Sequence, residues 1–213
     1  MKLLISIIKS LIWIICFFAA VAIAFQSLRF LDFQPKELLL SKGALVDQNV
    51  YLIGFYTHIT LASVALVVGP IQFLAWIRQR QLILHRSLGA IYVTSCFLGG
   101  ISGVYIAFYA DKGPITSYGF GALGISWLLC TTMAYQSVRK KQFAAHREWM
   151  LRSYACTFAA VTLRIWLPLL IMVFGMSFER AYQLDSFLAW VPNLIVMEIY
   201  ITKTRPRPIA KHT

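Results

Sequence analysis

Apolar residues along the chain fall into six long runs, which short polar or basic segments separate. A helix that crosses a bilayer needs roughly 20 mostly apolar residues, so each run is a candidate span. The runs cover residues 3–25, 51–76, 88–109, 118–135, 154–174 and 187–201. This pattern predicts an all-α, polytopic membrane protein with six transmembrane helices in a single membrane domain, residues 1–202. A basic tail, residues 203–213, follows the domain.

The first run also has a feature of a secretory signal peptide. The stretch "AAVAIAF" places small residues where a signal peptidase would cleave. The run is longer than the apolar core of a usual signal peptide, which favours a retained membrane anchor. Five spans with an external N-terminus is the alternative, and it leaves the rest of the topology unchanged.

The composition is typical of the same class of protein. Only 13% of the 213 residues are charged and 59% are hydrophobic, whereas soluble domains carry about 25% charged residues. The mean hydropathy is +0.70. The net charge of +12 would suggest a nucleic-acid partner for a soluble protein, but here the basic residues form short clusters between apolar runs, as topology signals do. We therefore expect a lipid bilayer and no nucleic acid as partner.

The lysines and arginines predict the orientation of the helices. Fourteen of these 20 residues fall on one side of the predicted membrane, and five fall on the other side alongside six acidic residues. Short basic connections are retained in the cytoplasm. The count therefore predicts a bacterial inner-membrane protein with both termini in the cytoplasm.

Two of the basic connections resemble each other. "IRQRQLILHR", residues 77–86, aligns without a gap with "VRKKQFAAHR", residues 138–147, and four of the ten positions are identical. The offset of 61 residues corresponds to two helices with their connections. We interpret the pattern as a duplicated helical hairpin, so that predicted helices 2–5 form a central four-helix bundle. Chance similarity between basic loops is the alternative.

The repeat places His85 and His146 at the cytoplasmic ends of predicted helices 3 and 5. These helices run in the same direction and can face each other across the bundle. Two such imidazoles are what a six-coordinate haem iron needs. The neighbouring cations would neutralise haem propionates or attract an anionic donor; the candidates for cofactor binding are Arg78, Arg86, Arg139 and Arg147. A histidine beside an arginine at a helix end can also be simply interfacial, and a proton or ligand site is a further reading.

His58 and Arg164 lie deeper in the predicted membrane. Ionisable groups at such depths are costly and usually face the bundle interior or a cavity. Arg164 follows His146 by 18 residues, which is five helical turns, so both point the same way. We expect His58 and Arg164 to form a site for an anion, a propionate or a quinone carbonyl in the outer half. The alternative is that Arg164 extends towards the headgroups or bonds a backbone carbonyl.

Met150, Ser153 and Thr157 share the helix face of His146 and Arg164, which predicts a mildly polar stripe along an apolar helix. In predicted helix 2, Pro70 should bend the helix near its centre. Gln72 follows this bend and is a further candidate for ligand binding.

Three stretches together are similar to the prokaryotic predicted-membrane-protein family known as domain of unknown function 2306. They are "HITLASVALVVGPIQF", "LHRSLGAIYVTSCFLGGISGVYIA" and "AHREWMLRSYACTFAAVTLRIW". The resemblance extends over about residues 50 to 170. It implies a membrane fold and no particular activity.

A shorter resemblance is to cytochrome b561, a six-helix electron carrier whose central four helices hold two b haems. "LHRSLG" is similar to a stretch at the start of that family's third helix. The resemblance implies that His58, His85 and His146 are haem ligands on helices 2, 3 and 5. The fourth-helix histidine is missing, because the repeat counterpart of His58 is Gly119. We therefore expect only one haem.

The function that these observations favour is a single-haem b-type protein. It would pass electrons from a cytoplasmic donor to a quinone or another small redox partner. The alternatives are a small non-redox transporter or sensor that binds an anionic ligand at His58 and Arg164, and a structural membrane subunit without a site.

Overall fold

A computed structural model describes residues 2–31 and 39–205, and every element assigned in these ranges is helical. The all-α class is therefore confirmed for the described residues. The long helices are α1 (Lys2–Ser27), α2 (Asn49–Gln72), α4 (Leu82–Ala107), α5 (Pro114–Arg139), α6 (Phe143–Thr157), α7 (Ala159–Met172), α8 (Phe178–Leu188) and α9 (Val191–Thr204). Short elements are η1 (Leu28–Phe30), η2 (Leu40–Asp47) and α3 (Ala75–Arg80).

Fewer described helices than the six predicted spans are long and apolar enough to be identified as membrane-crossing. Four segments within the described residues are long and apolar enough, namely Ser10–Ser27, Asn49–Gln72, Leu82–Ala107 and Phe178–Thr204. The bent pair α6 and α7 makes a fifth if it forms one span. α5 has 26 residues, but glycines and hydroxyl-bearing side chains interrupt its apolar sequence. The structure thus supports four or five spans by length and composition, and six are not confirmed.

Two predicted spans have different boundaries in the structure. The span predicted at 154–174 is two helices, because α6 begins at Phe143 and a 40° bend separates it from α7. The span predicted at 187–201 begins earlier, with α8 at Phe178, and continues in α9. Hydropathy shows where an apolar run begins. The helix itself can begin earlier, because charged residues that pair with one another can also be helical.

Two ion pairs show how the charged part of α6 is accommodated. Arg152 binds Glu198 of α9 through both carboxylate oxygens, with 2.9 Å between Arg152 Nη2 and Glu198 Oε2. Arg205, just after α9, binds Glu148 with an Nη2 to Oε2 distance of 2.6 Å. These pairs attach α9 to α6 at the end where the two basic connections lie.

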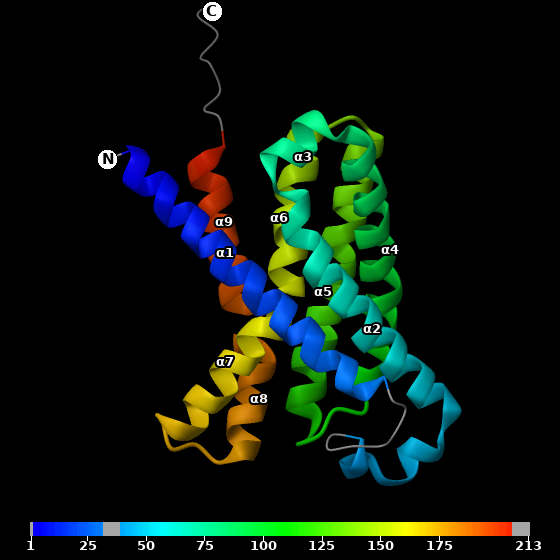
Figure 1. Ribbon diagram of the computed structural model, residues 1–213. Helices are drawn as coiled ribbons and strands as arrows, with labels where there is room; N and C mark the ends of the chain where they lie inside the picture. Colours follow the sequence, from blue (N-terminus) through cyan, green and yellow to red (C-terminus); the bar gives the residue numbers. More distant parts are fainter. Residues whose placement is uncertain (1, 32–38, 206–213) are drawn as a thin grey trace, which may run out of the picture.

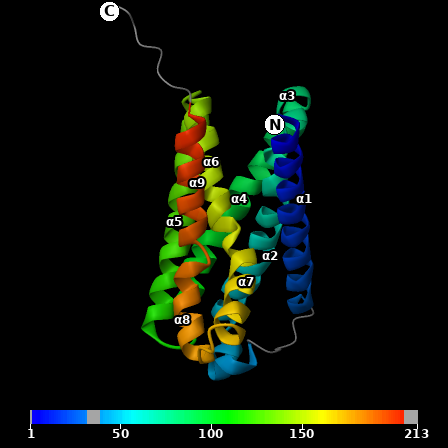
Figure 2. The ribbon, with the colours of Figure 1, turned by 90° about the vertical axis from the view of Figure 1, so that its left-hand side faces the viewer.

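The helices α2, α4, α5 and α6 pack together as a central set (Figure 1). α2 packs on α4, α4 packs on α5, and α5 packs on α6. α1 lies outside this set against α2 and α7, and α9 lies against α6 (Figure 2). α8 contacts both α5 and α7. The molecule therefore has a core of four helices with α1, α7, α8 and α9 around it.

One end of the molecule carries both basic connections. The α2–α4 connection with α3, the α5–α6 connection, the start of α1 and the end of α9 all lie there (Figure 1). We call this the basic end. The predicted tail lies mostly outside the described residues, because residues 206–213 are not among them.

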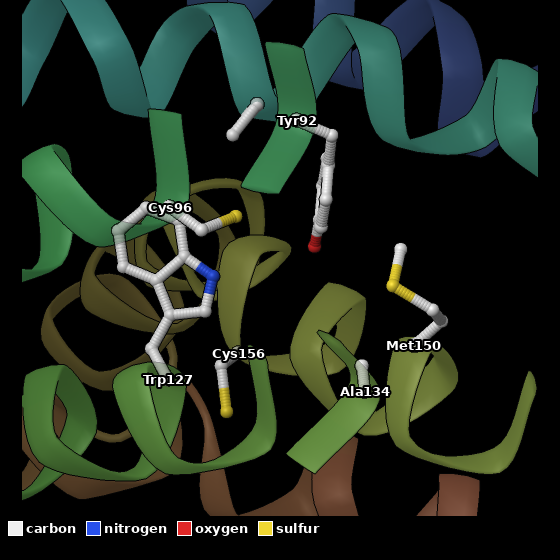
Figure 3. Packing of buried hydrophobic residues seen from close by; sticks show 7 residues of the cluster. Tyr92, Cys96, Trp127, Ala134, Met150 and Cys156 are labelled. Atoms are coloured by element: carbon white, nitrogen blue, oxygen red, sulfur yellow. The ribbon is translucent and has the colours of Figure 1, made fainter. Parts of the chain in front are cut away.

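The largest buried cluster draws on all four central helices. It contains Ala65, Tyr92, Cys96, Trp127, Ala134, Met150 and Cys156. Tyr92 extends from α4 towards α6, which carries Met150 and Cys156 (Figure 3). The close approach of the helices depends on small residues. A Cβ at Gly69 would lie 2.4 Å from the ring of Tyr154.

Four hydroxyl groups form a hydrogen-bonded cluster inside this core. Tyr92 Oη lies 3.0 Å from both Ser153 Oγ and Thr157 Oγ1, and Ser153 Oγ lies 2.8 Å from Thr131 Oγ1. Ser153 and Thr157 belong to the polar stripe predicted from the sequence, and Met150 is buried with them. The cluster joins α4, α5 and α6, and it pairs hydroxyls that are buried in the core.

Removing the Tyr92 hydroxyl should destabilise the core without changing its shape. We expect Tyr92→Phe to reduce the free energy of unfolding by about 1–3 kcal/mol, because it removes two buried hydrogen bonds with a usual net value of about 0.5–1.5 kcal/mol each. A decrease in the thermal midpoint of the detergent-solubilised protein would show it. Tyr118→Phe, at an exposed tyrosine of α5, is the control and should leave the midpoint unchanged. Equal midpoints for both variants would contradict the prediction.

Candidate functional site

A pocket of about 800 Å³ opens at the basic end between α2, α4, α5 and α6. We call it the basic-end pocket. Its wall is mostly apolar and includes Phe73, Leu82, Val93, Phe143 and Met150. The volume is in the range of cavities that bind cofactors and drug-sized ligands. The arginines and both histidines in the wall come from the two similar basic connections, residues 77–86 and 138–147.

The two copies of the repeat have the same local geometry. Gln81 precedes α4 and Gln142 precedes α6, each as the residue before the first helical position. The backbone N–H of His85 donates to Gln81 O at 2.8 Å, and that of His146 donates to Gln142 O at 2.9 Å. Each histidine is therefore the fourth residue of its helix, and both line the basic-end pocket.

His146 has a defined tautomer. Its Nδ1 lies 2.9 Å from the carbonyl oxygen of Ala134 in α5. A carbonyl only accepts, so Nδ1 carries the proton and Nε2 of the neutral ring has a free lone pair. Metal-ligating histidines are usually oriented by such a bond from the non-ligating nitrogen. His146 is thus arranged as a nitrogen ligand or a hydrogen-bond acceptor.

Two further polar atoms in the pocket wall have no hydrogen-bond partner among the described residues. They are His85 Nδ1 and Gln72 Nε2, and both are buried. Buried polar atoms are normally paired, because leaving one unpaired costs about 1–3 kcal/mol. These two atoms are therefore available to bond to a ligand or to water in the pocket.

Three arginines surround the same pocket, namely Arg78, Arg86 and Arg147. Arg147 also stacks over the ring of Tyr200, 5.9 Å from its centroid. The three guanidinium groups suit an anionic group such as a carboxylate or phosphate. Arg139, the fourth predicted cation, is exposed at the end of α5 and is not among the residues of the wall.

The position of Gln72 follows from the end of α2. The expectation of a bend near the middle of a 51–76 helix is wrong, because α2 ends at Gln72 and Pro70 lies in its last turn. The chain then turns at Leu74, which has an extended conformation, into α3. Gln72 therefore lies in the basic-end pocket and not beside His58 and Arg164.

His58 and Arg164 line a different pocket of about 320 Å³. It lies where α6 ends and α7 begins, and we call it the helix-break pocket. Lys42 of η2, Thr157 of α6 and Tyr182 of α8 also line it. The two residues that the sequence placed at similar depth thus share one cavity. Sequence reasoning missed Lys42 and Tyr182, since both come from segments outside the central hairpins.

The described residues contain no group of three or more histidine, cysteine, aspartate or glutamate side chains that could hold a metal ion. Two protein ligands suffice for haem iron, because the porphyrin supplies the other four. The donors of the basic-end pocket, with its apolar wall and its arginines, fit that requirement. They fit equally an amphipathic ligand that carries an anionic group and a hydrogen-bond acceptor.

Asp185 is a buried acid that the sequence did not single out. It is fully buried in α8, and neither carboxylate oxygen has a hydrogen-bond partner within the described residues. An unpaired carboxylate in such a place is costly. The only sequence signal is an acidic residue close to the apolar run at 187–201.

Neutralising Asp185 should therefore cost little. We expect the thermal midpoint of Asp185→Asn to equal or exceed that of the unchanged protein, because the substitution removes a buried charge and no ion pair. Asp111→Asn is the matched comparison, since Asp111 Oδ1 lies 2.8 Å from Lys42 Nζ. A larger decrease for Asp185→Asn than for Asp111→Asn would show that the Asp185 carboxylate is charged and paired.

The model of the family described as "Predicted membrane protein (DUF2306)" matches residues 55–201, which is more than half of the chain. The match includes both pockets' histidines and both halves of the repeat. No curated protein and no solved structure matches the chain.

Proposed function

The chain belongs to the family of predicted membrane proteins with domain of unknown function 2306, and we propose that it binds one b-type haem in the basic-end pocket and transfers electrons. As a membrane protein it has a lipid bilayer around it. The observation that carries the proposal is the presence of His85 and His146, from two different helices, in the wall of one largely apolar pocket. Two imidazoles and an apolar enclosure are what a six-coordinate b-type haem needs.

The side chains of the pocket would divide the work of holding the group. His146 would bind iron through Nε2, with its orientation maintained by the bond from Nδ1 to Ala134 O. His85 would supply the second nitrogen. Arg78, Arg86 and Arg147 would bind the propionates by charge-assisted hydrogen bonds. When bound, haem supplies reversible one-electron chemistry.

Among the described residues, the part of the bundle away from the basic end has no room for the fourth-helix ligand of a second haem. The repeat counterpart of His58 is Gly119, and a Cβ at this position would lie 2.1 Å from Ser186 Oγ of α8. α8 therefore occupies the space in which a fourth-helix ligand would lie. The likeness to cytochrome b561 would extend to one haem only.

The proposal includes the topology inferred from the sequence. We propose a bacterial inner-membrane protein with six spans, a duplicated hairpin in the central helices, and the basic end in the cytoplasm. The clustering of both basic connections at one end supports this orientation. An anionic donor would then approach the basic end, and a quinone or small redox protein would accept electrons elsewhere.

A reduced-minus-oxidised visible spectrum of the protein tests the proposal. The protein is purified in detergent from cells that are supplied with haem, and the haem content is measured as a pyridine complex. We expect a b-type spectrum and about one haem per chain, as two axial histidines require. A colourless protein would refute the proposal and leave an anionic amphipathic ligand as the occupant of the basic-end pocket.

A further inference from the structure

The helix-break pocket has a charge that no described residue neutralises. Arg164 lies in its wall and is also exposed. Its one hydrogen bond among the described residues runs from Nη1 to the carbonyl oxygen of Ala160, one turn earlier, at 2.7 Å. Lys42, the other cation of the wall, is already paired with Asp111. Arg164 thus lacks an anionic partner within the described part of the chain.

His58 adds a second polar group to this pocket. Its Nδ1 lies 2.8 Å from Gly99 O and therefore donates to it, which leaves Nε2 for another partner. The ring fits because Gly103 has no side chain: a Cβ there would lie 2.7 Å from His58 Nδ1. The imidazole is held in one orientation at the pocket wall by α4.

The break between α6 and α7 lies in the wall of the pocket. The helices meet at a 40° bend, and Ala159 and Ala160 in the first turn of α7 line the pocket. The N-terminal end of a helix carries a partial positive charge. Interrupted membrane helices commonly present such ends to anionic groups of a ligand. Cys156 and Thr157 at the C-terminal end of α6 line the pocket too, and the opposite partial charge there offsets that of α7, so the pocket's positive charge comes mainly from Arg164.

The rest of the wall is apolar and aromatic. Phe55, Phe120 and Trp127 contribute rings, and Phe120 packs edge-on against Tyr182 with 5.6 Å between centroids. A volume of about 320 Å³ is at the lower limit for ligand pockets, and suits one ring with small substituents. A doubly charged or strongly hydrated ion would bring its hydration water into the pocket, in contact with these apolar rings.

We propose that the helix-break pocket binds a small organic monocarboxylate with an apolar or aromatic body, whose carboxylate contacts Arg164 and His58. The carboxylate neutralises the unpaired guanidinium, and the body fills the aromatic part of the cavity. This site is separate from the basic-end pocket and does not depend on haem.

Isothermal titration calorimetry with benzoate tests the proposal on the full-length protein in detergent. We expect saturable binding with one site per chain. Benzyl alcohol, which has the same ring without the charge, should bind at least about tenfold more weakly, because a charge-assisted bidentate contact is worth more than 1.4 kcal/mol. No benzoate binding, or equal binding of both compounds, would overturn the proposal.

Variants identify the site. Arg164→Gln should weaken benzoate binding about tenfold or more, and Arg164→Lys, which keeps the charge, should lose less. Gly103→Ala should also weaken binding because it displaces the His58 ring. Arg180→Gln, at an exposed arginine of α8 outside this pocket, is the control and should bind as the unchanged protein does. Unchanged binding in both Arg164→Gln and Gly103→Ala would overturn the assignment.

A quinone head group is the competing occupant, and the same titration distinguishes it. Binding of a decyl-substituted benzoquinone that Arg164→Gln abolishes, with no heat from benzoate, would overturn the carboxylate proposal. The visible spectrum of the basic-end pocket is recorded on the same samples. Failure of the carboxylate proposal would leave that spectrum unaffected, so the two proposals fail separately.

Discussion

Replacing His146 by alanine is expected to abolish the b-type spectrum of the purified protein completely. The substitution removes one of the two protein nitrogens in the basic-end pocket, and the described part of the pocket wall offers no third histidine to take its place. His85→Ala should have the same result. His58→Ala is the matched control: it removes a histidine of the same bundle that lines the helix-break pocket, and the spectrum should be retained.

A conservative substitution separates ligation from structural support. His146→Met keeps an iron ligand but changes its chemistry, and a methionine ligand increases the reduction potential of haem. We expect a redox titration to show a higher midpoint potential with haem still bound. A spectrum that survives in His146→Ala but disappears in His58→Ala would instead place the haem in the helix-break pocket.

Replacing Gly119 by alanine is expected to produce the largest loss of stability among the single substitutions considered. A Cβ at this position would lie 2.1 Å from Ser186 Oγ, 2.6 Å from Ser186 Cβ and 3.0 Å from its backbone carbon. The backbone of α8 would have to move, since no rotation of one side chain relieves all three contacts. Overpacking of this kind costs about 1–3 kcal/mol, and more where backbone must shift.

The neighbouring glycine provides the control. Gly121 lies on the same helix two residues away, and a Cβ there would meet nothing within 4 Å. Because alanine is a better helix former than glycine, Gly121→Ala should leave the thermal midpoint unchanged or raise it slightly. The midpoint of Gly119→Ala should decrease by several degrees. Equal midpoints would show that α8 does not pack on α5 in the membrane.

The candidate residues were predictable to different extents for physical reasons. The shared frame around His85 and His146 was visible because both lie at one position of a repeated segment. The partners of the histidines were not visible. Ala134 O binds His146 only because α5 and α6 pack in one particular register, and no residue type marks a backbone carbonyl as an acceptor.

Arg164 was also predictable only in part. Its cost in an apolar helix made it a candidate from the sequence. The turn count from His146 did not give its surroundings, because the helix breaks between the two residues; Arg164 is exposed and bonds the carbonyl oxygen of Ala160, as the alternative reading expected. The position of the bend at Phe158 was not predictable, because neither glycine nor proline occurs there. Lys42 enters the helix-break pocket from η2, a segment without an apolar period that could have predicted its place.

The sequence by itself determined the class of this protein: the apolar runs require a bilayer, and their period and length require helices. It also determined which residues are chemically anomalous, since few polar groups occur in those runs. Only the tertiary structure decided which anomalous residues share a cavity, that Gln72 belongs with His85 and His146, and that Arg139 does not. The physical reason is that apolar helices can pack in many registers, and contacts between small residues such as Gly69, Gly103 and Gly119 select one.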